Sequence, residues 1–271
     1  MNDSADSAAA SIEAIRAEIE AIDQQILDLA TRRLRAADGL IAVKPAAGSA
    51  FPIRPAREVA LLRRLIASAQ APMEPEQVVE LWRALIAANV RRQGPVDVVV
   101  AGGVDPVRLF DVARRHFGGR TRIHRATDPR AALARATEQV NCVAVVPWPG
   151  PLGPGGWWPT LSESKYHRLA LIAALPMRQG ETAEPEAAVF AQNAPVEPAG
   201  GDVTLALAFD QHRRAAKTLA DAGFVAHEVA RSEPRVLYGL EGFVPADDVR
   251  VTALARGAID GFRVVGSYAR V

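Results

Sequence analysis

The first ninety residues carry apolar side chains at helical spacing. Isoleucine or leucine recurs every three or four positions from Ile12 to Leu29, which is the period of an amphipathic α-helix. Ser11 is a suitable residue to cap the start of this helix, and Pro45 ends the pattern. The pattern therefore predicts a long first helix that begins at residue 11, after a disordered tail over residues 1–10.

Two shorter helices are expected to follow. Between Pro45 and Pro55 the chain holds small residues and prolines, which predicts a loop. Apolar periodicity then indicates a second helix at residues 56–69 and a third at residues 76–92, and Gly94-Pro95 marks its end. The sequence thus predicts an all-α module of three helices over residues 11–94.

The next hundred residues alternate between strand and helix patterns. Residues 96–101 form a continuous apolar run, as in a buried parallel strand. The further expected elements are helices at 107–117 and 129–138, and strands at 120–124 and 142–146. Residues 147–159, rich in Pro, Gly and Trp, are expected to form a loop, whereas the pattern of residues 166–175 fits either a strand or a helix. We expect a small α/β segment over residues 95–195.

The last seventy residues have a strand–helix–strand–strand–helix–strand pattern. The expected strands lie at 203–209, 224–230, 236–244 and 262–268, and the expected helices at 211–222 and 246–259. This order is typical of the ferredoxin-like α+β fold. The predicted fold is therefore multidomain: a three-helix module, a small α/β segment and a ferredoxin-like domain over residues 202–271.

Composition narrows the classes of function. Hydrophobic residues make up 49% of the 271 residues and the formal net charge is +1, so no overall field attracts nucleic acid or an anionic membrane. Cys142 is the single cysteine, which excludes a disulfide within the chain and argues against a cysteine metal site. Residues 1–10 do not resemble a signal peptide. We expect a soluble cytoplasmic protein that binds no metal, nucleic acid or membrane.

Several polar residues of the helical module share helix faces. Arg33 and Lys44 are eleven positions apart, about three helical turns. Asn89 and Gln93 are four apart, hence also on one face. Taken singly, each of these residues is most simply a solvated charge or a helix-end group.

As a set they resemble the helical (AroQ-class) chorismate mutases over about residues 11–94. That family has an Arg in the first helix, a second Arg further along it, a Lys eleven residues later, an Arg-Glu pair at the start of the second helix and a Gln that closes the third. The resemblance implies that no cofactor is needed and that the residues act as follows: Arg16, Arg33 and Arg57 bind the substrate carboxylates, Lys44 and Gln93 donate hydrogen bonds to the ether oxygen, Glu58 binds the ring hydroxyl, and Asn89 lies near the pocket.

The chemistry of such residues fits this reaction. Chorismate is a dianion, and carboxylates favour guanidinium partners. A Claisen rearrangement requires only that a compact conformer be held and that charge developing on the ether oxygen be stabilised. Arg16 and Arg33 lie about 25 Å apart on one helix, so one substrate can contact both only if Arg16 comes from a second copy. This predicts an intertwined homodimer with shared sites.

Two residues depart from the family pattern. Arg54 stands where an acidic residue is common, just upstream of Arg57-Glu58. Pro45 restricts the backbone of Lys44, so its ammonium group is expected to be aimed differently from that of the family.

The remaining segments resemble parts of bifunctional chorismate mutase–prephenate dehydratases. His116-Phe117-Gly118 and Val145-Val146-Pro147 are similar to motifs of the dehydratase region, but Thr121-Arg122-Ile123 lies too early to be its catalytic motif, and the segment is too short. We expect no dehydratase activity.

The final segment resembles an ACT domain at Glu241–Val244 and Val265–Ala269, which implies an aromatic amino acid as a possible effector. Two hypotheses remain: an active chorismate mutase, or a non-catalytic regulator whose helical module dimerises and whose C-terminal domain binds an aromatic amino acid or a partner enzyme.

Overall fold

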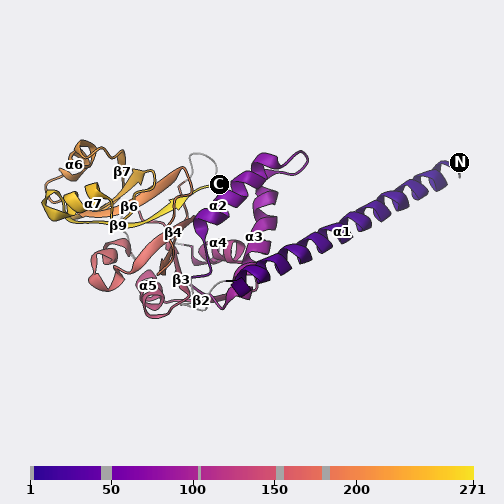
Figure 1. Ribbon diagram of the computed structural model, residues 1–271, viewed down its shortest axis with the longest axis horizontal. Helices are drawn as coiled ribbons and strands as arrows, with labels where there is room; N and C mark the ends of the chain where they lie inside the picture. Colours follow the sequence, from indigo (N-terminus) through magenta and orange to yellow (C-terminus); the bar gives the residue numbers. More distant parts are fainter. Residues whose placement is uncertain (1–2, 44–50, 103–104, 151–155, 179–183) are drawn as a thin grey trace. The chain divides into compact units, whose positions relative to one another are not determined.

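A computed structural model of the chain describes residues 3–43, 51–102, 105–150, 156–178 and 184–271 (Figure 1). The chain divides into two compact units, residues 1–47 and residues 48–271.

The first unit contains a single long helix, α1 (Asp3–Val43). It begins eight residues before the expected start at Ser11, so most of the expected disordered tail over residues 1–10 is helical instead. Alanine has the highest helix propensity of any residue type. The run of alanines at residues 8–10 therefore favours extension of the helix toward the N-terminus.

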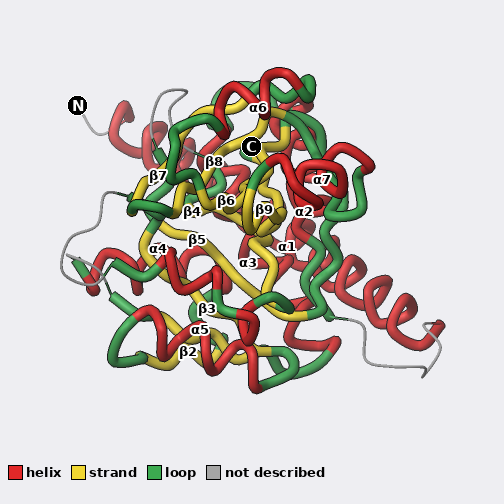
Figure 2. Tube along the Cα trace, turned by 90° about the vertical axis from the view of Figure 1, so that its left-hand side faces the viewer, coloured by secondary structure: helices red, strands yellow, loops and turns green. Residues whose placement is uncertain are grey.

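The second unit is built on one nine-stranded sheet with the order β2-β1-β3-β5-β4-β9-β6-β8-β7 (Figure 2). In its first half, β1 (Asp97–Val100) pairs in parallel with β2 (Arg122–Arg125) and β3 (Cys142–Pro147). Strand β5 (Ala187–Gln192) is antiparallel to both β3 and β4 (Leu169–Leu175). The ambiguous pattern at residues 166–175 is thus mainly a strand, and β5 was not expected.

The second half has the ferredoxin-like topology that the sequence predicts. Its elements are β6 (Asp202–Phe209), α6 (Ala215–Asp221), β7 (Ala226–Ser232), β8 (Arg235–Glu241), α7 (Val249–Ala253) and β9 (Asp260–Ala269). The strands pair in the antiparallel order β9-β6-β8-β7. The helix expected at 246–259 is shorter than predicted, because a π-helical turn, η3 (Leu254–Ala258), follows α7.

The two halves of the sheet meet at a single parallel pairing between β4 and β9. Leu171 is paired there with Gly266. The α/β segment and the ferredoxin-like segment therefore share one sheet, and the expected separation between residues 195 and 202 does not divide the fold.

Helices cover both faces of the sheet. Helix α5 (Pro129–Glu138) and the short 3-10 turns η1 (Trp158–Ser162) and η2 (Ser164–Tyr166) pack on one face, where Leu133, Trp158 and Phe190 share a core. On the other face, α4 (Pro106–Phe117) packs with α2 (Pro55–Ser68) and α3 (Pro75–Gln93).

Helices α2 and α3 belong to the same compact unit as the sheet. Val59 and Leu62 of α2 are buried in the same core as Val98 and Val100 of β1. Apolar side chains of α2 thus share a core with the sheet, and the division between the two compact units lies between α1 and α2.

Polar contacts also fix α2 to the sheet. Arg63 donates hydrogen bonds to the carbonyl oxygens of Ala199, Gly200 and Arg270, at 2.8, 2.6 and 2.9 Å. Arg54 forms an ion pair with Glu197 at 2.8 Å. Among the helices of the described residues, none is long and apolar enough to cross a membrane.

Candidate functional site

Helix α1 presents a row of apolar side chains to solvent. Six of them are 46–59% exposed, namely Ile12, Ile15, Ile19, Ile22, Ile26 and Leu29. Arg16 lies beside this row and forms an exposed ion pair with Glu13 at 2.6 Å. Arg33 lies seventeen positions further along the same helix, and Lys44 lies outside the described residues.

Helix α2 places Arg57 and Glu58 in different environments. Side chains of successive helical residues point about 100° apart. The Arg57 side chain is exposed, whereas Glu58 is buried toward α3. The structure therefore separates the two members of the expected Arg-Glu pair.

On α3, Asn89 and Gln93 lie one turn apart and are both partly exposed. This is the shared face that the sequence predicts. The side-chain oxygen of Asn89 is buried and has no hydrogen-bond partner among the residues that the structure describes. A buried acceptor without a partner costs free energy, so a donor at this position would be favourable.

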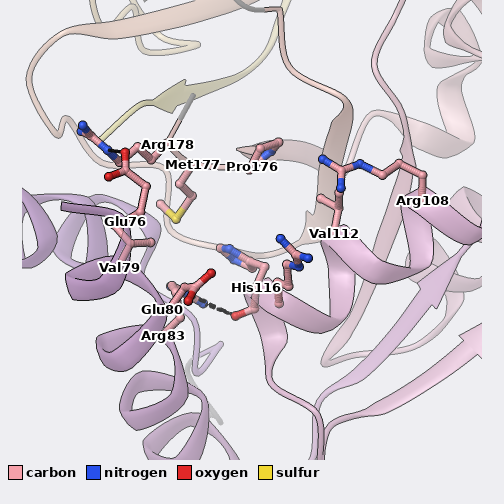
Figure 3. A pocket seen from close by; sticks show the side chains of 11 residues that line it. Glu76, Val79, Glu80, Arg83, Arg108, Val112, His116, Pro176, Met177 and Arg178 are labelled. Carbon is pink, nitrogen blue, oxygen red and sulfur yellow. Dashed lines mark hydrogen bonds and ion pairs between the residues drawn. The ribbon is translucent and has the colours of Figure 1, made fainter. Parts of the chain in front are cut away.

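A buried guanidinium holds Glu58. Arg83 of α3 forms an ion pair through its Nη1 with the Glu58 carboxylate, and both side chains are less than 10% exposed. Its Nε and Nη2 donate to the backbone oxygen of His116, at 3.0 and 2.7 Å (Figure 3). Arg83 thus connects α2, α3 and the C-terminal turn of α4.

The sequence pattern alone does not single out Arg83. It lies three and four positions before Ile86 and Ala87, which are both buried. A cation within an apolar stripe is rarely buried unless it is paired, and this was the signal that could have identified it.

His116 is buried beside this ion pair. Its ring packs edge-on against Phe117, with 4.6 Å between the ring centroids. Burial, and to a smaller extent the Arg83 cation, lowers the pKa of His116 well below its usual value. The imidazole is therefore neutral at physiological pH.

A pocket of about 220 Å³ lies between α3, α4 and the residues that follow β4 (Figure 3). Val79, Val112, Pro176 and Met177 supply its apolar surface. Charged residues of both signs also line it, among them Arg83, and so does His116 (Figure 3). This site was not expected from the sequence.

The helices now described match a known family. Residues 15–94 match chorismate mutase type II. These residues, the mutase segment, cover most of α1 and all of α2 and α3, but less than a third of the chain. No curated protein matches the chain in sequence.

Solved structures similar to the chain include two prephenate dehydratases. One is from Streptococcus mutans (13% identity, TM-score 0.45) and covers 65% of this chain and 100% of its own. The other, from Arthrobacter aurescens and in complex with L-Phe, has 14% identity and a TM-score of 0.44, with coverages of 65% and 90%. A third is the quorum-quenching acylase GqqA (12% identity, TM-score 0.46), with coverages of 65% and 95%.

Proposed function

We propose that the mutase segment isomerises chorismate to prephenate, in the biosynthesis of aromatic amino acids, and that it does so as a homodimer. The family match supports the reaction class. The observation that carries the dimer is the exposed apolar row of α1.

The size of this row favours a protein partner over solvent. Six large apolar side chains are each about half exposed. Burying the exposed half would contribute roughly 5–9 kcal/mol, taking about 1.5–3 kcal/mol for each fully buried side chain. A second α1 helix offers the same row, so a two-fold arrangement is self-complementary.

The spacing of the arginines on α1 supports sites that are shared between two copies. Arg16 and Arg33 lie seventeen residues apart, or about 25 Å along the helix. A single chorismate cannot span that distance. In our proposal Arg16 of one copy and Arg33 of the other bind one substrate, together with Arg57.

The remaining residues supply hydrogen bonds rather than covalent chemistry. Lys44 and Gln93 would donate to the ether oxygen, where negative charge develops as the C–O bond breaks. Asn89, one turn from Gln93, would lie beside the substrate, where its buried oxygen could accept a hydrogen bond. Glu58 would bind the ring hydroxyl through Oε1, the carboxylate oxygen that does not pair with Arg83.

Mixing two inactive variants tests this proposal. Arg16→Ala and Arg33→Ala should each abolish the loss of chorismate absorbance, because each removes a carboxylate partner. After subunit exchange, heterodimers hold one intact site, so part of the activity should return. Arg32→Ala, an exposed neighbour of Arg33, is the matched control and should remain active. Failure to recover activity after verified exchange would contradict the shared site.

Two pairings favour a second candidate function, a non-catalytic regulator. Glu58 is held by Arg83 and Arg54 is held by Glu197, so two positions near the expected site have structural partners. In this alternative the helices dimerise and the ferredoxin-like half binds an aromatic amino acid or a partner enzyme. Purified protein that consumes no chorismate would favour this alternative.

We do not propose dehydratase activity. Thr121 precedes β2 and its hydroxyl donates to the backbone of Phe117, while Arg122 is the exposed first residue of that strand. These positions support a structural role for Thr121-Arg122-Ile123. A direct assay of prephenate decarboxylation would test this point.

A further inference from the structure

The pocket between α3, α4 and the residues after β4 has the properties of a small-molecule site, and none of the described residues that we propose to bind chorismate lines it. We propose that it binds an α-amino acid with an apolar side chain. The proposal rests on the size of the pocket, on which of its charged groups are already paired, and on its apolar surface (Figure 3).

The volume suits one small metabolite. About 220 Å³ is available, which is less than the roughly 300–1,000 Å³ of pockets that hold drug-sized ligands. The pocket has side chains from two helices and from a segment distant in sequence, so its shape is fixed by the tertiary fold.

Two of the cations at this site are already engaged by carboxylates. Arg108 donates two hydrogen bonds to Glu186, both at 2.7 Å. Arg178 donates to Glu76 at 2.6 Å. The Arg178–Glu76 pair joins the segment after β4 to α3 across the pocket, whereas Glu186 does not line it. With two nitrogens bound to Glu186, Arg108 keeps little capacity for a charged ligand.

Among the described residues that line the pocket, one carboxylate is unpaired, and two guanidinium groups, those of Arg115 and Arg178, are engaged through Nε alone. Glu80 on α3 forms no hydrogen bond or ion pair within the described residues, and it is exposed. Arg115 on α4 pairs with Asp111 through Nε at 3.0 Å, and its two Nη groups have no partner in the described part of the chain. A ligand with an ammonium group and a carboxylate could satisfy both residues at once.

A ligand with a single charge fits less well. An anion would bring its charge near Glu80, and a cation would bring its charge near Arg115; either arrangement leaves one side chain unsatisfied. A zwitterion has neither defect. The two residues lie on facing helices of one pocket, so they would also orient the ligand.

The apolar surface indicates the nature of the ligand side chain. Val79 and Val112 come from the two helices, and Met177 points toward the space between them (Figure 3). Methionine adapts its shape to different apolar partners. We therefore expect an aliphatic or aromatic side chain to lie against these residues.

Calorimetric titration of the full chain tests the site. L-Leucine, L-methionine and L-phenylalanine are titrated separately at a pH of about 7, where both charges of the ligand are present. At least one should bind with one site per chain. Two analogues of phenylalanine are titrated as well: 2-phenylethylamine lacks the carboxylate and 3-phenylpropionate lacks the ammonium group. Each should bind about tenfold or more weakly.

Variants locate the binding. Glu80→Gln and Arg115→Gln change exposed side chains, so the fold should persist, and each should weaken binding about tenfold or more. Arg114→Gln, at the adjacent exposed position of α4, should leave the affinity unchanged.

Three results would overturn the proposal. The first is that none of the three amino acids binds at concentrations up to about 10 mM. The second is binding that is unaffected by Glu80→Gln and Arg115→Gln, which would place the ligand elsewhere, for example in the ferredoxin-like half. The third is analogues that bind as tightly as the amino acid. None of these readouts depends on chorismate turnover, so they are independent of the proposed mutase activity.

Discussion

Replacing Arg83 with methionine should leave the Glu58 carboxylate buried without a cation. The two side chains are 7% and 9% exposed, and removal of one partner of a buried pair costs about 3–5 kcal/mol. The His116 carbonyl also loses two donors. A domain is stable by only about 5–15 kcal/mol in total, so Arg83→Met should be among the most destabilising single changes in the second unit.

Urea denaturation measures the effect. With a loss of about 4 kcal/mol and a slope near 3 kcal/mol per molar urea, the midpoint should fall by about 1.3 M. Addition of Glu58→Gln removes the uncompensated charge, and the double variant should regain about 1–2 kcal/mol relative to Arg83→Met. Arg64→Met, at an exposed position of α2, is the matched control and should shift stability by less than about 0.5 kcal/mol.

Either of two outcomes would refute the energetic coupling of Glu58 and Arg83. In the first, Arg83→Met is no more destabilising than Arg64→Met, so that Glu58 does not need its partner. In the second, the costs of Glu58→Gln and Arg83→Met simply add, so that the two side chains are not coupled.

Two further predictions concern His116 and Gly266. Because the pKa of His116 is lowered in the folded state, the unfolded state takes up the proton first as the pH falls, and the free energy of unfolding should drop by about 1.4 kcal/mol between about pH 7.5 and about pH 5.5. Chemical denaturation at both pH values should show that His116→Gln removes this component. A pH dependence that His116→Gln leaves unchanged would contradict burial of the neutral ring. Gly266→Ala would place a methyl group against the backbone of Leu171. The free energy of unfolding should therefore fall by about 2–3 kcal/mol, which a lower melting temperature would show. Gly150→Ala, with open space around the new methyl group, should melt like the parent protein.

Local patterns predicted most of the elements. Helical periodicity located α2 and α3, and the order of strands and helices after residue 202 predicted the ferredoxin-like half with its topology. These features depend on neighbouring residues, which a sequence displays directly. Strand β5 was missed because its short, alanine-rich run carries little strand preference of its own, and its place is fixed by pairing with β3 and β4.

Long-range contacts explain the remaining differences. The sequence could not show that β4 and β9 meet at Leu171 and Gly266, so it suggested two domains where there is one sheet. It placed Glu58 on a helix but not against Arg83, twenty-five residues away. The pocket likewise depends on residues from α3, α4 and the segment after β4, which no local pattern brings together. The roles that the family resemblance implies stay predictions for all seven residues: Arg16, Arg33, Lys44, Arg57, Glu58, Asn89 and Gln93.

The carbonyl contacts of Arg63 have a consequence for how the mutase segment can be studied. This one side chain bonds to the stretch that precedes β6 and to the residue that follows β9. A fragment cut after residue 94 would keep the arginine but lose all three acceptors, and would expose Val59 and Leu62 to water. A fragment that holds only α1, α2 and α3 should therefore be prone to aggregation. The sheet is the scaffold on which α2 and α3 fold.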